Sequence, residues 1–483
     1  MDKKFRIFTI CSFLYCLLLA LVCHPVVMES QGDAPAYIEL AKQFLGMSDN
    51  TTDLSSRQPL YSLFLAPFIS IWGENGFSYP VMYCQFFMVF LSSLLLYKLF
   101  EKFLLFKSFP LIITILYLLN LSTINYASSI LSETFSLLIF TIIVYVLIEN
   151  SEKDRISLWF VLGLLAGLMV LARFNMLGLP VFIVLCMLLI HYRHYGITGL
   201  KKSIYPFLYY FLGLLLVLNI WSLYNLRENG FYGVFPPYHA GQRWAIPATI
   251  KRTNHISGKY KPLLEIFVKA RQKYEKENPS ISLKKGSLLE NQAAQRLYLS
   301  LKPQVNGYQV YKLAHDDLLK YFDLKDNSVD NARLGYLLKP FYKEIAKQNR
   351  AKLTKFRFYS LINTFRAGGT TLAVDEKMNI NALPPVLVKI YKVIFFCMAA
   401  ITFLVAALFF VFKIKSIKEH KNWKVFILII LISYFPVVHF YANVISDANR
   451  FKFPAEPLII GLFIYFVHAG SEYLKMKITP YKF

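Results

Sequence analysis

Several ionisable side chains stand at the ends of long apolar runs, where a charge is costly and marks a functional site or a buried pair. Two are the carboxylates Asp33 and Glu133. A carboxylate can move a proton or hold a cation, and grouped cations can hold a phosphate. The basic members of the set are Arg57, Arg173, Arg227, Arg450 and Lys452.

Asp33 and Arg57 lie before two short amphipathic or apolar segments. Asp33 leads into Tyr37, Leu40 and Ala41, whose spacing predicts a helix lying flat on the membrane. The competing interpretation of Asp33 is a helix N-cap. Arg57 precedes residues 59–72, a run too short to span a bilayer, which we expect to lie in or dip into the outer interface. An arginine at that position also commonly reaches headgroups.

Glu133 and Arg173 are predicted to face the same side of the membrane. Glu133 lies about a turn inside the outer end of an apolar run, where a carboxylate requires a partner or a water-filled cavity. Arg173 occupies the turn between two later runs. A purely structural ion pair between them is the competing interpretation.

Arg450 and Lys452 interrupt an aromatic interface before the last apolar run, and Arg227 follows an earlier one. Adjacent positive charges at headgroup depth would suit a phosphate group. Simple anchoring to headgroups is the alternative.

The composition identifies a polytopic membrane protein. Of 483 residues, 56% are hydrophobic and only 17% are charged, and mean hydropathy is +0.44. These values exclude a soluble multidomain or disordered chain. The net charge of +24 is explained by basic loops and anionic lipid, so no nucleic-acid partner is expected. All six cysteines fall in apolar runs, which argues against disulfides and cysteine-based metal sites.

The fold class predicted is all-α, with about ten transmembrane helices, amphipathic juxtamembrane helices and a mostly helical external domain. The first run is interpreted as a retained anchor because small-residue cleavage signals are missing. The expected spans begin near Phe5, Tyr79, Pro110, Ser128, Leu158, Met176, Tyr205, Val386, Val425 and Pro457.

Lysine and arginine counts in the short loops set the orientation. Alternating spans place Lys98, Lys102 and Lys107 inside with the other lysine-rich loops, and leave few cations outside. Both termini are therefore predicted to be cytoplasmic. The expected domains are an N-terminal transmembrane module (1–223) with its first external loop (27–76), an external domain (224–385) and C-terminal helices (386–483). Helix-like spacing in the external domain covers residues 263–276, 310–322 and 336–358.

The order and common sidedness of these short motifs resemble integral-membrane glycosyltransferases of the GT-C class. The likeness is to bacterial relatives of protein O-mannosyltransferases and of lipid A aminoarabinose transferases. It extends over most of the chain. The residues that carry it are Asp33, Arg57 through Tyr61, Ser132-Glu133, Ala172-Arg173, Asn225, Gly230 and Arg450 through Pro454.

That resemblance implies a sugar donor carried on a polyprenyl phosphate, attacked with inversion by an acceptor glycan, lipid or protein. Asp33 would be the base, and Glu133 would position the acceptor or a cation. Arg173, Arg450 and Lys452, with Arg57 and Arg227, would stabilise the phosphate. Tyr37 and Tyr61 would contact acceptor or sugar. The site would face the extracytoplasmic side of a bacterial inner membrane.

Cofactor requirements follow from the same chemistry. A phosphate leaving group requires no redox cofactor or nucleotide, and the nine histidines show no ligand spacing. A divalent cation therefore has no assigned ligands and stays an open alternative. The protein O-mannosyltransferases have an acidic doublet where Ala34 follows Asp33 here, which weakens the case for a protein acceptor.

Two other functions compete with monosaccharide transfer. A transporter or flippase for a lipid-linked glycan would also need cations near headgroups. It would, however, place charges near the bilayer midplane and often shows inverted repeats, neither of which the sequence has. A polysaccharide polymerase or ligase would share the large external loop and transfer whole chains.

Overall fold

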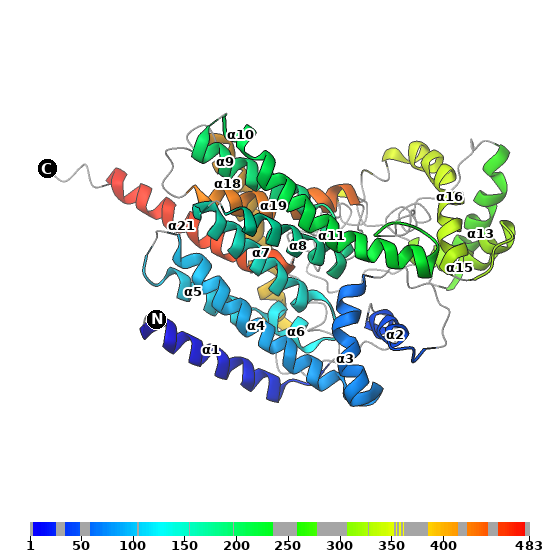
Figure 1. The fold of residues 1–483 in the computed structure, drawn as a ribbon, viewed down its shortest axis with the longest axis horizontal. Helices are drawn as coiled ribbons and strands as arrows, with labels where there is room; N and C mark the ends of the chain where they lie inside the picture. The colour runs from blue at the N-terminus through cyan, green and yellow to red at the C-terminus, as the bar shows by residue number, and fades with distance from the viewer. Residues whose placement is uncertain are drawn as a thin grey trace.

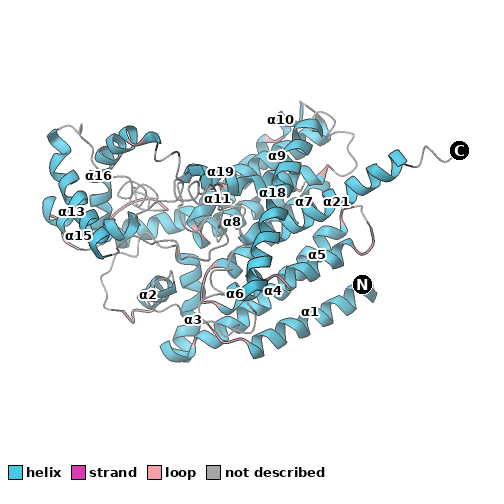
Figure 2. Ribbon diagram, turned by 180° about the vertical axis from the view of Figure 1, so that it is seen from behind, coloured by secondary structure: helices cyan, strands magenta, loops and turns pink. Residues whose placement is uncertain are grey.

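The computed structural model of the chain describes residues 3–25, 34–48, 58–103, 106–153, 155–196, 198–234, 258–277, 307–326, 328–351, 385–413, 423–442 and 453–478, with positions 354, 357, 358 and 361. Every regular element among them is helical (Figures 1 and 2). The α-helices are α1 (Lys3–Val22), α2 (Ala34–Phe44), α3 (Pro59–Gly76), α4 (Ser78–Glu101), α5 (Phe109–Leu118), α6 (Leu121–Ser128), α7 (Glu133–Lys153), α8 (Ile156–Ala172), α9 (Leu179–Tyr195), α10 (Thr198–Lys202), α11 (Ile204–Asn229), α13 (Lys261–Glu277), α15 (Gly307–Tyr321), α16 (Ser328–Gln348), α18 (Pro385–Lys413), α19 (Lys424–Ala442) and α21 (Glu456–Ile478).

Seven of the described helical segments are long and apolar enough to cross a membrane, and the bent pair of α5 and α6 makes an eighth. The shorter apolar helices α8 and α19 lie at two more of the expected positions. The all-α polytopic fold class is thus confirmed, and the chain is an integral membrane protein.

One expected boundary is displaced. The run predicted to begin near Ser128 starts as a helix at Glu133, because residues 121–128 form the separate short helix α6 and residues 129–132 are not helical. The chain also bends by 49° between α5 and α6. Asn120 causes the break locally: its side-chain Oδ1 accepts a hydrogen bond from the backbone N–H of Ser122 at 2.8 Å and so caps α6.

Helix α3 runs steeply across the direction of α4 and packs beside α2 (Figure 1). Its backbone kinks at Gly73, whose φ of 69° is favourable for glycine alone. An ion pair of 2.6 Å between Lys42 and Glu74 joins the far ends of α2 and α3. This pair of short helices forms a platform at one end of the bundle.

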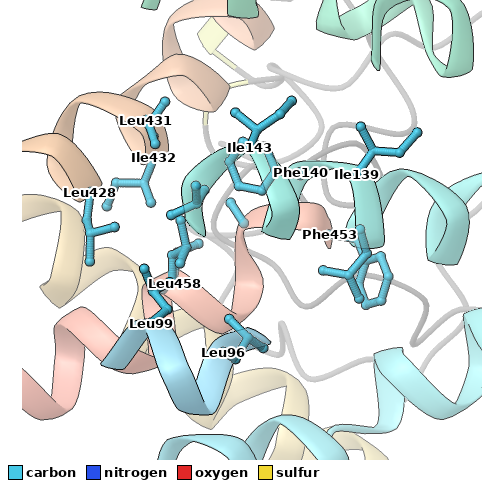
Figure 3. Packing of buried hydrophobic residues seen from close by; sticks show 14 of the residues in the cluster. Leu96, Leu99, Ile139, Phe140, Ile143, Leu428, Leu431, Ile432, Phe453 and Leu458 are labelled. Atoms are coloured by element: carbon cyan, nitrogen blue, oxygen red, sulfur yellow. The ribbon is translucent and has the colours of Figure 1, made fainter. Parts of the chain in front are cut away.

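The bundle core is made by apolar side chains from helices that lie far apart in sequence. Leu96 of α4, Phe140 of α7 and Ile432 of α19 belong to one buried cluster (Figure 3). Phe453, which precedes α21, also packs in this cluster. The C-terminal helices are therefore part of the same core as the N-terminal ones.

Helices α8 and α11 approach each other at their glycines. A Cβ added at Gly163 would lie 2.0 Å from the carbonyl oxygen of Tyr210, and one at Gly213 would lie 2.4 Å from that of Phe160. Gly167 follows Gly163 by four residues, which completes a small-residue stripe on α8. Backbone contact this close is possible only without side chains.

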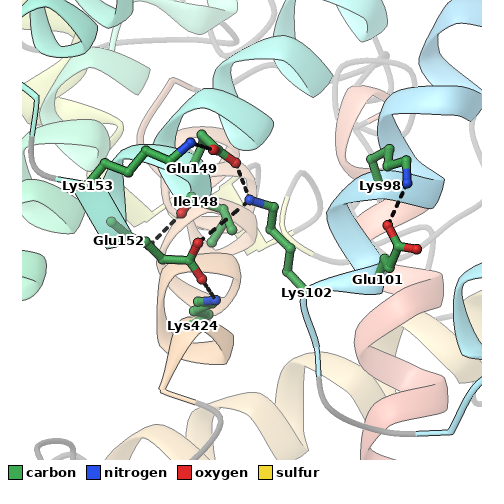
Figure 4. Close-up of polar contacts among 9 residues, drawn as sticks. Lys98, Glu101, Lys102, Ile148, Glu149, Glu152, Lys153 and Lys424 are labelled. Carbon is green, nitrogen blue, oxygen red and sulfur yellow. Dashed lines mark hydrogen bonds and ion pairs between the residues drawn. The ribbon is translucent and has the colours of Figure 1, made fainter. Parts of the chain in front are cut away.

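Charged side chains collect at the ends of α4, α7 and α19 (Figure 4). Glu149 forms ion pairs with Lys102 and Lys153, and Glu152 forms them with Lys424 and, at 3.8 Å, with Lys102. Burial opposes the charge of Lys102, but the hydrogen bond to Glu149 and both carboxylates outweigh it and raise the pKa of Lys102. Lysines from three different loops, all assigned inside by the sequence, therefore meet at one end of the bundle.

Helices α13, α15 and α16 share a second core of their own. It contains Phe267, Val310, Leu338 and Phe341, and the rings of Phe267 and Phe341 stack with centroids 5.7 Å apart. These helices lie together at one end of the molecule (Figure 1). The domain boundaries near residues 224 and 385 stay predictions.

Candidate active site

A buried ion pair joins the ends of α7 and α8. The Nη2 atom of Arg173 lies 3.3 Å from Oε1 of Glu133, and the two residues are 3% and 0% exposed. Glu133 is the first residue of α7, where the helix dipole favours a carboxylate. Arg173 follows α8 as its C-cap, with an extended backbone conformation. Two predicted site residues are therefore brought into contact.

Tyr37 and Tyr61 pack next to this pair. Their rings meet edge to face with centroids 5.2 Å apart, and the Tyr37 hydroxyl lies 3.3 Å from Oγ of Ser132, the neighbour of Glu133. Burial, followed by the charge of Glu133, raises the pKa of Tyr61 well above its ordinary value. Tyr61 is thus a neutral donor at physiological pH, unable to act as a base.

Gln85 of α4 is a site residue that sequence reasoning missed. Its Oε1 accepts from the Tyr61 hydroxyl at 3.0 Å, and its Nε2 donates to the carbonyl oxygens of Ala127 and Ser129 at 3.0 and 2.7 Å. Gln85 so satisfies backbone carbonyls in the last turn of α6 and just after it. A single amide within an apolar run was the signal that would have found it.

Glu456 is a second missed residue, fully buried at the start of α21. Its Oε2 accepts from Nδ2 of Asn120 at 3.2 Å, and the Tyr391 hydroxyl donates to Oδ1 of Asn120 at 2.6 Å. Three segments far apart in sequence meet here. The available signal was a carboxylate at the very end of an apolar run, directly before Pro457.

Four of the predicted site residues, Asp33, Arg57, Arg450 and Lys452, lie outside the described residues. The residues that follow three of them in the chain are buried. Ala34 is 0% exposed, Gln58 is 8% exposed and Phe453 is 0% exposed. The ring of Phe453 packs on Tyr126 of α6 with centroids 4.6 Å apart.

Arg227 is placed differently from Arg173. Its side chain is 86% exposed and pairs with its neighbour Glu228 at 3.2 Å, whereas that of Arg173 is 4% exposed and pairs with Glu133. For metal binding, the part of the chain that the structure describes brings no three His, Cys, Asp or Glu side chains together. The described contacts are those of an ion pair, hydroxyls and amides.

Comparison with known proteins gives one family. Residues 56–222 match the family described as dolichyl-phosphate-mannose-protein mannosyltransferase. No curated protein matches the chain. Crystal structures of ArnT from Cupriavidus metallidurans, one bound to undecaprenyl phosphate and one in the apo state, are similar at 10% and 11% identity. They cover 92% and 95% of this chain and 78% of ArnT, each with a TM-score of 0.37.

The family match confirms the resemblance to the GT-C class and supports a membrane glycosyltransferase of that class. The matched family is that of the mannosyltransferases, and it covers α3 to α11, which contain Tyr61, Gln85, Glu133 and Arg173.

Proposed function

We propose that the protein transfers a sugar from a polyprenyl-phosphate-linked donor to an acceptor glycan, lipid or protein, with inversion at the anomeric carbon. The observation that carries this proposal is the buried Glu133–Arg173 pair beside Tyr37 and Tyr61. Burying the two charges costs roughly several kcal/mol per ion before their mutual attraction is counted. A polar substrate site at this end of the bundle would account for that cost, because the two charges would then bind or orient the substrate.

Asp33 is proposed as the base that takes the proton of the attacking hydroxyl. It immediately precedes α2, whose Tyr37 lies one turn further on and contacts Ser132. The developing charge on the acceptor oxygen is relieved as the proton leaves, so a carboxylate within hydrogen-bond reach lowers the barrier. Glu133 would orient the acceptor or hold the guanidinium of Arg173 in place.

The leaving group is a lipid phosphate, which gains negative charge as the glycosidic bond breaks. Arg173, Arg450 and Lys452 are proposed to stabilise it, with Arg57 assisting. Lys452 directly precedes Phe453 in the chain, and the buried Phe453 packs against α6 and α7. Arg227 is the weakest member of this set because it is exposed and paired with Glu228.

The site is proposed to face the extracytoplasmic side of a bacterial inner membrane, with both termini cytoplasmic. Glu133 begins α7, and Glu149 of the lysine-rich group lies near the other end of the same helix. Arg173 and Glu456 lie at the end of α8 and the start of α21. This relative placement supports the orientation that the loop charges indicate. The helical unit of α13, α15 and α16 would stand on the same outer side.

The test is a donor panel. Purified protein is incubated with polyprenyl-phosphate sugars and acceptors, and the products are identified by mass. We expect transfer by the natural chain and loss of transfer in Asp33→Asn, with retained folding and lipid binding. Glu39→Gln on the neighbouring α2 is the matched control and should stay active. Full activity of Asp33→Asn would remove Asp33 as the base.

The transporter and polymerase alternatives give different products in the same panel. A flippase would move the lipid-linked sugar across vesicles without any covalent product. A polymerase or ligase would transfer whole chains and leave single sugars in place. Either result would replace the proposed reaction.

A further inference from the structure

Three lysines form a line along the exposed face of α16. Lys339, Lys343 and Lys347 are four residues apart, so they lie one above another at intervals of about 6 Å. All three are exposed. Within the described residues, none of them takes part in an ion pair.

Such a line is unfavourable for the isolated helix. Like charges four residues apart on a helix repel, whereas opposite charges at that spacing stabilise it. The neighbouring α13 follows the favourable pattern: Arg271 pairs with Glu275 at 2.8 Å. The exposed Lys269 and Lys273 of α13 likewise have Glu265 and Glu277 four residues away. Lys269 and Lys273 are also four residues apart, but each has a glutamate four residues away on its other side. In α16, by contrast, Lys339 and Lys343 have no acidic residue three or four positions away, and Lys347 has only Glu344, three residues before it.

The opposite face of α16 is already in use. Leu334, Leu338, Phe341 and Ile345 are buried in the core that α16 shares with α13 and α15. A helix that lies in a membrane interface needs an apolar strip beside its cations to insert between lipids. Beside the lysines only Tyr336 and Leu337 are large, apolar and exposed among the described residues of α16. Two side chains do not form such a strip, so a charged partner in water fits this face better than a bilayer.

We propose that the lysine line of α16 binds a linear polyanion, namely a glycan chain that carries phosphate or carboxylate groups at regular intervals. Each anionic group would neutralise one lysine and remove the repulsion between neighbours. On the proposed function, this chain is the sugar acceptor, held by its charged backbone while its end enters the site. The binding itself does not depend on catalysis.

The experiment measures binding of fluorescent inorganic polyphosphate to the full-length protein in uncharged detergent at several salt concentrations. The test variant is Lys339→Gln with Lys343→Gln and Lys347→Gln. The matched control is Lys269→Gln with Lys273→Gln and Lys276→Gln on α13, which removes equal charge. We expect the test variant to bind about tenfold more weakly or worse, with a salt dependence shallower by about two to three in log–log slope. The control should bind like the natural chain.

A second variant separates binding from folding. Lys343→Glu places a glutamate between two lysines and creates two attractive pairs in place of two repulsive ones. We expect a melting temperature equal to or above that of the natural chain together with weakened polyphosphate binding. Weakened binding accompanied by a lower melting temperature would indicate a damaged helix and would overturn the proposal.

Two further results would also overturn it. Equal weakening by the α13 control would show that net charge alone attracts the polymer. Stronger binding to phosphatidylglycerol vesicles than to polyphosphate, lost in the test variant, would show that the face meets lipid. Failure of this proposal is distinct from failure of catalysis, because transfer to a small neutral acceptor does not require α16 and Asp33→Asn should bind polyphosphate normally.

Discussion

At the scale of single residues, the Glu133–Arg173 pair has two possible roles, and they make different demands. A structural pair is needed only because each charge would be costly without the other. A catalytic pair must also present charge to the substrate. The distance of 3.3 Å and near-complete burial are compatible with both, so variants must remove the charges without removing the fold.

We expect Glu133→Gln to lower the free energy of unfolding by about 3–5 kcal/mol, because it leaves Arg173 buried without its counter-charge. The double variant Glu133→Leu with Arg173→Met should recover most of that loss, since apolar side chains can replace a buried pair. It should nonetheless stay inactive. Thermal unfolding in detergent and the transfer assay measure the two effects, and an active double variant would make the pair purely structural.

Tyr61→Phe should cost about 1–2 kcal/mol, because it leaves the buried Oε1 of Gln85 without its hydroxyl donor. The loosened contact between α3 and α4 should also raise the KM for the acceptor. Tyr83→Phe on the exposed face of α4 is the control and should change neither quantity. A neutral Tyr61→Phe would show that the hydroxyl is dispensable.

The residues differ in how visible they were in the sequence. Glu133 and Arg173 could be predicted because charges inside apolar runs stand out. An ion pair between them was one of the two interpretations that the sequence offered, but its geometry could not be predicted, since it depends on how α7 begins and α8 ends. Gln85 and Glu456 were missed for a related reason: a single polar residue in a span acquires meaning only from the partners that other helices bring to it, as Asn120 does for Glu456.

At the scale of elements, the contact between α8 and α11 depends on glycine. Gly163→Ala would place a methyl group 2.0 Å from the carbonyl oxygen of Tyr210, so the two helices must separate. We expect a fall in melting temperature of several degrees, in line with overpacking costs of about 1–3 kcal/mol. Gly470→Ala in α21, which meets nothing within 4 Å, should be neutral or slightly stabilising. Equal melting temperatures of the two variants would contradict the close approach of α8 and α11.

The break between α5 and α6 shows the limit of apolar patterning for elements. Hydropathy predicted two continuous spans near Pro110 and Ser128, because the residues at the break are mostly apolar or small. The bend depends instead on Asn120, which caps α6 and bonds to Tyr391 and Glu456 from the C-terminal half. Long-range bonds of this kind leave no local signal.

At the scale of the whole molecule, the helix ends gather at two opposite ends of the bundle. One end holds Lys102, Glu149 and Lys424, and the other holds Glu133, Arg173 and Glu456. Positive charge in the loops predicted this separation before any contact was known. Loop statistics could not show that lysines from three loops share two carboxylates.

The orientation is tested by labelling in intact cells with a membrane-impermeant maleimide, in a variant whose native cysteines are replaced. Met47→Cys, at an exposed position after α2, should be labelled. Lys107→Cys, in a loop assigned inside, should be labelled only after the cells are opened. The cysteine-free parent controls for background. The reverse pattern would place the proposed site in the cytoplasm.

The central claim is that segments far apart in the chain form one site for a lipid phosphate. A photoreactive polyprenyl phosphate, cross-linked to the full-length protein and mapped by mass spectrometry, tests it most directly. The expected result is labelling of peptides around residues 33, 133 and 452, suppressed by unlabelled polyprenyl phosphate. Labelling confined to lipid-facing helices such as α1 and α18, without competition, would contradict the claim.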